Sequence, residues 1–205
     1  MKSLPRSSGD LLADRCADTF DTALVDKLGY RVPALLFDAV RDTGPFDLAV
    51  DLGCGTGLKG ERLRPIVGRL EGYDISAAML KRAESKGLYD RLVKAGLQSL
   101  ELPEASADLI IAADVLMYVG RLEAIVAMAA RACRSGGTLA FSVEESTGPD
   151  AFRLRDSRRY AHSETYVREV VAEPRLELAS LSVEPIRMDR GTAIQGLIVV
   201  ARRGK

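Results

Sequence analysis

The sequence predicts one α/β domain with a mostly parallel seven-stranded sheet, helices on both faces and an antiparallel last strand. An apolar run at residues 48–52 breaks into Gly53, Gly55 and Gly57 and is followed by apolar residues at helical spacing. Apolar runs then alternate with amphipathic stretches along the chain. Two alternating stretches near the C-terminus, joined by a turn at Gly191, predict an antiparallel hairpin.

Length and charge narrow the class of protein. At 205 residues a single domain is the natural expectation, and the 29 basic and 29 acidic residues favour neither nucleic acid nor an anionic membrane as a partner. No apolar run approaches the roughly 18 residues of a spanning helix, and the N-terminus lacks the apolar segment of a signal peptide. Three widely spaced cysteines form neither a zinc pattern nor a disulfide framework, so we expect no metal and a cytoplasmic location.

The N-terminal part is expected to be a helical cap. Residues 1–9 are polar and predict a flexible tail, and residues 10–44 predict two helices that cover a core formed by residues 45–205. The first helix would begin at Asp10, and the second would have Pro33 in its first turn and end near Gly44.

The core elements follow in alternation. Strands are expected at residues 46–52, 70–74, 89–95, 107–114, 138–144, 176–188 and 193–203. Helices are expected after the glycine turn over residues 58–67, at residues 76–86 and 121–134, and after Ser163 as N-cap. Residues 145–161 are expected to be irregular.

The glycine turn allows two interpretations. Gly55, Gly57 and Gly60 match the spacing of the dinucleotide fingerprint, which brings a pyrophosphate to a helix N-terminus. Asp51, just ahead of the glycines, would repel such an anion and would suit a ligand with cationic groups. S-adenosylmethionine (SAM) carries an ammonium and a sulfonium and has no phosphate.

Residues 50–57, Val-Asp-Leu-Gly-Cys-Gly-Thr-Gly, resemble motif I of the class I SAM-dependent methyltransferases. The resemblance covers nearly the whole chain from about residue 10 and implies the Rossmann-like fold of that class, SAM as cofactor and S-adenosylhomocysteine (SAH) as product. Asp74 ends the second strand, where an acid can accept hydrogen bonds from ribose hydroxyls, although it could instead only cap a helix. Residues 74–76 resemble the second motif of the family, which implies that Ser76 caps the next helix. The expected cofactor-binding residues are Asp51, Gly53, Cys54, Gly55, Gly57, Asp74, Ile75, Met79, Leu97, Gln98 and Asp114.

Three of these residues depend on departures or alternatives. Many relatives place an acid after the third strand to bind adenine, whereas this chain has Leu97 and Gln98, whose backbone and side chain would take that role. Asp114 ends a central strand, where α/β sheets place their ligands, but it could also be a helix cap or make a loop hydrogen bond.

The N-terminal helices resemble those of a methyltransferase subgroup named as related to tetratricopeptide-repeat proteins. The similarity lies in Asp14, Ala17, Phe20, Asp21 and residues 24–33. Cys16 stands where that subgroup commonly has a tyrosine that covers the cofactor, so Phe20 or Tyr30 would substitute for it. No 34-residue period is present, so the chain holds no tetratricopeptide array.

The binding site for the substrate that accepts the methyl group is expected around residues 145–166. Arg153, Arg155 and Tyr160 are predicted to bind the substrate, or else the arginines form a solvated face. His162 and Tyr118 are predicted to be the catalytic residues. His162 would be a general base, or else it would orient the loop, and Tyr118 lies close to the predicted strand end.

The resemblance implies in-line transfer of a methyl group from SAM to a small-molecule or carrier-bound acceptor, and the arginines favour an acidic one. An Asn/Asp-Pro-Pro-Tyr motif is absent, which argues against nucleic-acid bases as acceptors. The chain would be a monomer or a homodimer. Two alternatives remain open at this stage: a non-catalytic SAM- or SAH-binding module that regulates a partner, and an NAD-dependent oxidoreductase.

Overall fold

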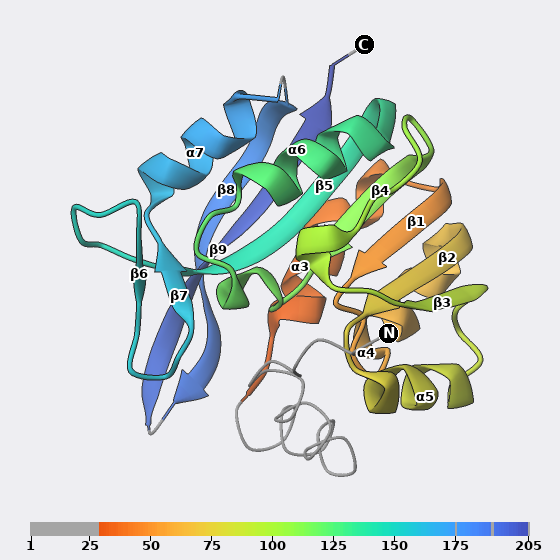
Figure 1. Cartoon of the computed structure of the whole chain (residues 1–205), viewed down its shortest axis with the longest axis horizontal. Helices are drawn as coiled ribbons and strands as arrows, with labels where there is room; N and C mark the ends of the chain where they lie inside the picture. The colour runs from red at the N-terminus through yellow and green to blue at the C-terminus, as the bar shows by residue number, and fades with distance from the viewer. Residues whose placement is uncertain (1–28, 175, 190, 205) are drawn as a thin grey trace, which may run out of the picture.

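The computed structural model describes residues 29–174, 176–189 and 191–204. The predicted tail, the helix from Asp10 and the positions Cys16 and Phe20 lie outside these residues. The described part is a twisted sheet with helices on both faces (Figure 1).

Nine strands form the sheet. Their bounds are β1 Phe46–Leu52, β2 Val67–Asp74, β3 Arg91–Lys94, β4 Ala107–Ala112, β5 Cys133–Glu145, β6 Phe152–Leu154, β7 Tyr160–His162, β8 Leu176–Asp189 and β9 Thr192–Arg203. The first five are parallel in the order β3-β2-β1-β4-β5, β9 is antiparallel to β5, and β8 is antiparallel to β9. The seven predicted strands and the reversed last strand are therefore confirmed, and β6 and β7 are added to them.

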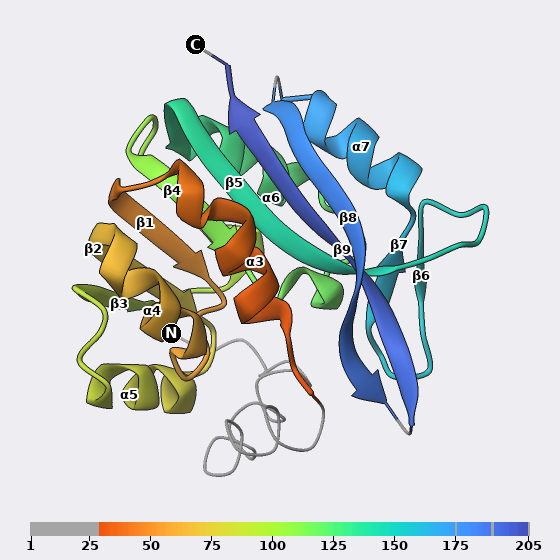
Figure 2. The same cartoon turned by 180° about the vertical axis from the view of Figure 1, so that it is seen from behind.

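The helices pack on the two faces of this sheet. They are α3 Val32–Val40, α4 Leu58–Leu63, α5 Ala77–Ser85, α6 Glu123–Ala132 and α7 Glu164–Ala172. Figure 1 shows α6 and α7 on one face, and Figure 2 shows α3 on the other. Each face has its own apolar core: Val126 and Val167 belong to one, and Leu36 and Leu63 to the other. The central strand β4 is buried at every residue, which explains its unbroken apolar sequence.

Two segments differ from the sequence expectation. The helix after the glycine turn ends at Leu63, because Pro65 lacks the N–H that another α-helical turn requires, and Val67 already begins β2. Residues 145–161 are not irregular throughout, since β6 and β7 form a small antiparallel pair. Strand β7 adds to the end of β5 in parallel, with Ala161 opposite Glu144, beyond the residues of β5 that pair with β4.

No described helix is long and apolar enough to cross a membrane. Among the same residues, no group of three or more histidine, cysteine or acidic side chains is placed to hold a metal ion.

Candidate functional site at the carboxyl ends of the parallel strands

Three acidic residues gather at one edge of the sheet. Asp51 is in β1, Asp74 ends β2, and Asp114 follows β4. Because β1 pairs with both β2 and β4 in parallel, the carboxyl ends of these strands lie next to one another, where open α/β sheets place their ligands. The glycine turn leaves β1 at the same edge.

The turn requires glycine for local reasons. Gly53, Gly55 and Gly57 have φ angles of +65°, +56° and +91°, which L-residues with a side chain rarely adopt. A Cβ on Gly53 would also lie 2.5 Å from the side chain of Val115. A Cβ on Gly55 would meet no atom of the described residues within 4 Å, so among these residues the middle of the turn faces space that a ligand can occupy.

The backbone amides of the turn are already bonded within the protein. Those of Gly53 and Cys54 donate to the Tyr73 carbonyl at 2.8 and 3.0 Å, and that of Gly57 donates to Cys54 at 3.0 Å. The Gly55 amide donates to Asp74 Oδ2 at 2.9 Å. A pyrophosphate cradle needs free amides, and these four are already bonded within the protein.

Asp51 does not face a ligand directly. It is fully buried, and its carboxylate pairs with Lys59 Nζ at 2.8 Å and accepts a hydrogen bond from the Tyr89 hydroxyl at 2.8 Å. Burial raises the pKa of Asp51, and Lys59 opposes this rise. The expectation that the charge of Asp51 attracts a cationic ligand is therefore not supported, because Lys59 neutralises it.

Tyr89 also explains the third glycine of the apparent fingerprint. A Cβ on Gly60 would lie 2.8 Å from the Tyr89 hydroxyl and ring. Gly60 is thus needed where a tyrosine packs against helix α4, with no dinucleotide involved.

Asp74 is half-buried and joins the glycine turn to helix α5. Besides Gly55, it accepts a hydrogen bond from the Ser76 amide at 2.8 Å, and the Ser76 hydroxyl caps α5 by accepting from Met79. Each carboxylate oxygen has a second lone pair, so these bonds leave acceptor capacity for ribose hydroxyls. The helix cap is Ser76, as the sequence resemblance implies.

An apolar surface lies beside Asp74. Ile75 is 43% exposed, which is unusual for an isoleucine that follows a buried strand, whereas Met79 is buried. The short helical turn η4, Leu97–Ser99, follows β3, and Gly96 ahead of it lies beside the Ile75 side chain. Leu97 is half-buried and Gln98 is exposed, so both predicted adenine partners lie near this surface.

Asp114 occupies a left-handed backbone conformation with φ +55°. Its amide donates to the Ser142 hydroxyl at 3.0 Å, and its carboxylate lies 3.9 Å from the guanidinium of Arg187. Burial raises the pKa of Asp114, and the charge of Arg187 opposes this rise. Asp114 does not cap a helix, because the next element is the 3₁₀ turn η5, Leu116–Tyr118.

Two tyrosines lie toward this end of the sheet. Tyr118 is 56% exposed. Burial raises the pKa of Tyr30, and the negative charges of Asp114 and Asp51 add to the effect. Tyr30 is therefore close enough to these two acids for their charges to act on it, and its role in place of Cys16 stays a prediction.

His162 is not placed as a general base. The side chain is fully buried, and its Nε2 lies 3.0 Å from the Gly120 carbonyl and 3.1 Å from that of Val119. Its ring stacks on Tyr166, and burial lowers its pKa. The prediction of a catalytic His162 is corrected accordingly: the histidine holds the segment after η5, which matches the alternative role of orienting the loop.

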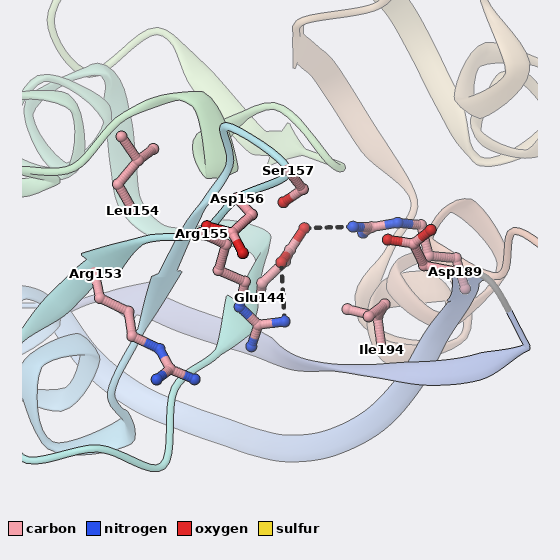
Figure 3. Close-up of a pocket in the computed structure, with 9 residues that line it drawn as sticks. Glu144, Arg153, Leu154, Arg155, Asp156, Ser157, Asp189 and Ile194 are labelled. Carbon is pink, nitrogen blue, oxygen red and sulfur yellow. Dashed lines mark hydrogen bonds and ion pairs between the residues drawn. The ribbon is translucent and has the colours of Figure 1, made fainter.

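The predicted substrate residues separate into two environments. Arg153 and Arg155 line a pocket of about 480 Å³ beside the end of β5 (Figure 3). Tyr160 is half-buried and packs edge-on against Phe152. The pocket is also lined by Glu144 and Arg187, which the sequence analysis did not select.

Comparison with known proteins agrees with this geometry. Residues 50–141 match a family model described as "Methyltransferase domain". "Methyltransferase-like protein 27" of Homo sapiens is 36% identical over 110 residues, which are 50% of this chain and 44% of that protein. A "Malonyl-[acyl-carrier protein] O-methyltransferase" of Hamiltonella defensa is 27% identical over 130 residues, 62% of this chain and 48% of that protein. The chain thus spans about half the length of the curated relatives it matches.

Solved structures share the whole fold. The N-methyltransferase NodS of Bradyrhizobium japonicum in complex with SAH superposes with a TM-score of 0.76 at 18% identity, covering 97% of this chain and 100% of NodS. A putative methyltransferase in complex with the Haloferax volcanii Trm112 methyltransferase activator also gives a TM-score of 0.76, at 19% identity, over 98% and 100% of the two chains. The chain therefore has the Rossmann-like fold of class I SAM-dependent methyltransferases, and its residues 50–141 carry the match to a methyltransferase domain.

Proposed function

We propose that this protein is a SAM-dependent methyltransferase, with SAM as cofactor and SAH as product. The observation that carries the proposal is the glycine turn, whose described amides are bonded to Tyr73, Asp74 and Cys54 and so are not free for a pyrophosphate. A ligand without phosphate fits a turn that offers space at Gly55 while four of its amides are already bonded within the protein. The match to a methyltransferase domain over residues 50–141 supports the same cofactor.

The residues at the strand ends have distinct proposed roles. Asp74 accepts hydrogen bonds from the ribose hydroxyls, and Ile75, with Leu97 and Gln98, forms the surface for adenine. Asp114 faces the cationic end of the cofactor, because its cation Arg187 is 3.9 Å away, beyond hydrogen-bond distance, whereas Lys59 pairs with Asp51 at 2.8 Å.

When bound, SAM supplies an electrophilic methyl group on its sulfonium sulfur. The protein's part is to hold the acceptor in line with that methyl group and to exclude water. Two described side chains are proposed to lie next to the transferred methyl group. They are Tyr118, which is exposed, and Tyr30, which is half-buried. His162 has no proposed part in proton transfer, because it is buried.

The finer assignments are proposals as well. The acceptor is a small molecule or a group on a carrier, as in the malonyl carrier-protein O-methyltransferases that the chain resembles. We also propose a cytoplasmic location and membership of the subgroup named for tetratricopeptide-repeat proteins. The subgroup assignment depends largely on residues outside the described part of the chain.

Calorimetric titration of SAM, SAH and NAD tests the proposal. SAM and SAH should bind with micromolar or tighter dissociation constants, and NAD should not bind. Micromolar NAD binding without SAM binding would show an oxidoreductase instead. Incubation with methyl-labelled SAM and a metabolite extract then separates an enzyme, which produces SAH, from a module that binds SAM without turnover.

A further inference from the structure

The pocket beside the end of β5 contains a linear array of alternating charges. Arg155 Nη1 lies 3.4 Å from Glu144 Oε2, and Arg187 Nη2 lies 2.5 Å from Glu144 Oε1. On its other side Arg187 faces Asp114, 3.9 Å away. Figure 3 shows the Glu144 carboxylate in the middle of the pocket, with an interaction at each oxygen. The array joins the pocket to the strand end that bears Asp114.

Three buried atoms of this array form no hydrogen bond with the described residues: Arg187 Nη1, Arg155 Nε and Glu144 Oε2. Glu144 Oε2 lies 3.4 Å from Arg155 Nη1, so an ion pair compensates it in part. A buried guanidinium N–H without an acceptor is costly, because it has lost its hydrogen bonds to water. The two nitrogens are donors, so an acceptor oxygen would complete them.

The charges of the array are balanced. Two guanidinium groups, those of Arg155 and Arg187, face two carboxylates, because both contact Glu144 and Arg187 Nη1 also lies 3.9 Å from Asp114. Asp114 is beyond hydrogen-bond distance, so it leaves Arg187 Nη1 open to an acceptor oxygen. At the rim, Asp156 and Arg153 are exposed and Asp189 is half-buried, so water screens their charges. The unbonded N–H groups, and not an excess of positive charge, therefore suit the pocket to an acceptor oxygen.

The two arginines differ in their freedom to move. The Arg187 side chain lies on β8 and makes the shorter contact with Glu144. Arg155 makes the longer contact, is 26% exposed, and also donates from Nη2 to the Glu145 carbonyl at 2.5 Å. Arg155 is consequently the guanidinium that can reorient toward an incoming ligand while Arg187 keeps Glu144 in place.

We infer that this pocket binds an anionic oxygen group of the methyl acceptor, a carboxylate or a phosphate, through Arg155 and Arg187. The inference rests on the proposed methyltransferase function. The pocket is assigned to the methyl acceptor because Arg187, which lines it, lies 3.9 Å from Asp114 at the proposed cofactor site. A guanidinium binds either group through two parallel hydrogen bonds. The anionic group of the acceptor would then be separated from Asp114 by the Arg187 side chain.

The test uses the SAH-saturated protein and three probes measured by calorimetry or by chemical-shift titration. Succinate and inorganic phosphate represent the two anions, and succinamide is the neutral counterpart of succinate. At least one anion should bind at least tenfold more tightly than succinamide, and the difference between succinate and phosphate identifies the group. Arg155→Met should remove this preference and leave SAH affinity within about threefold, a difference of roughly 0.7 kcal/mol.

Arg168→Met is the matched control, because Arg168 is an exposed arginine of α7 that pairs with Glu164 outside the pocket. It should bind the anions like the parent. Arg187→Lys, which keeps the charge and loses the planar donors, should weaken anion binding even if Arg187→Met does not fold.

The inference is overturned if SAH binds but neither anion is preferred over succinamide, or if Arg155→Met and Arg168→Met behave alike. A protein that binds anions in an Arg155-dependent way but never binds SAM or SAH would refute the proposed function and the assignment of the pocket to a methyl acceptor.

Discussion

The ammonium of Lys59 lies 2.8 Å from the carboxylate of Asp51, and the two side chains are 6% and 0% exposed. The same nitrogen donates to the Gly53 carbonyl at 2.8 Å and reaches the Ala113 carbonyl at 3.5 Å. Lys59 therefore ties helix α4 to the ends of β1 and β4 beneath the glycine turn. The pair is electrically neutral, so its effect on a ligand is to fix the shape of the turn.

Replacing Lys59 by Met should lower the free energy of unfolding by about 3–5 kcal/mol, because it leaves Asp51 buried without a cation. The double variant with Asp51→Asn should recover much of this loss. Urea unfolding measures both. Lys81→Met, on the exposed face of α5, is the control and should unfold like the parent. A single variant as stable as the parent would mean that the pair is not a structural support.

Asp74→Ala should weaken SAM binding by at least tenfold, since a hydrogen bond to a charged acceptor contributes roughly 1.5–3 kcal/mol. The variant should also unfold more easily, because the Gly55 and Ser76 amides lose their acceptor. Ser76→Ala removes the cap of α5, at a cost of about 0.5–2 kcal/mol, but retains the carboxylate. Calorimetry should find parental SAM affinity in Ser76→Ala. Equal loss of affinity in both variants would make Asp74 a structural residue only.

His162 should make the stability of the protein depend on pH. Burial lowers its pKa in the folded state below the ordinary value of 6.5, so the unfolded chain binds a proton that the folded chain does not. Its stabilising contribution is complete above pH 6.5 and is lost as the pH falls below that value toward the folded pKa. Between pH 7.5 and 5.5 the parent should lose about 1 kcal/mol more than His162→Gln.

Urea unfolding at the two pH values measures this difference. The comparison is clean because the chain has one histidine. Identical pH dependence in parent and variant would contradict the assignment of a buried, neutral His162. The same variant should keep a methyl-transfer rate of the parental order, since a glutamine amide can still donate to the Val119 and Gly120 carbonyls that His162 Nε2 contacts.

Gly53→Ala should abolish SAM binding and destabilise the fold. The substitution adds a clash with Val115 to the strain of a positive φ, together on the order of 2–5 kcal/mol. Gly87→Ala is the matched control, because Gly87 has a similar φ of +64° but open space around it. It should lose about 1–2 kcal/mol and keep its SAM affinity. Thermal unfolding and calorimetry distinguish the two effects.

The elements that the sequence predicted best are those set by local patterns. The unbroken apolar run of β4 and the Ser76 and Ser163 caps depend on residues close together in the chain, and the structure confirms all three. The short pair β6 and β7 escaped prediction, because strands of three residues give no readable alternation.

The candidate site was harder to predict because its charges pair over long distances. A lysine on a helix usually faces solvent, and only the fold shows that Lys59 turns inward to Asp51. Arg187 lies 43 residues from Glu144 in the chain. No sequence pattern around this arginine, which lies in a predicted hairpin, indicates that it contacts Glu144. The sequence also cannot show burial directly, so His162 was selected for its chemistry although the structure encloses it.

The four bonded amides of the glycine turn have a consequence for the energetics of ligand capture. Folding has already fixed these peptide groups, so an incoming cofactor does not have to order them, and little of its contact energy is spent on conformational entropy. The turn should look the same with and without ligand. The amides of Gly53, Cys54 and Gly55, which bond to Tyr73 and Asp74 of β2, should exchange with solvent deuterium only when β1 and β2 separate, even in the ligand-free protein.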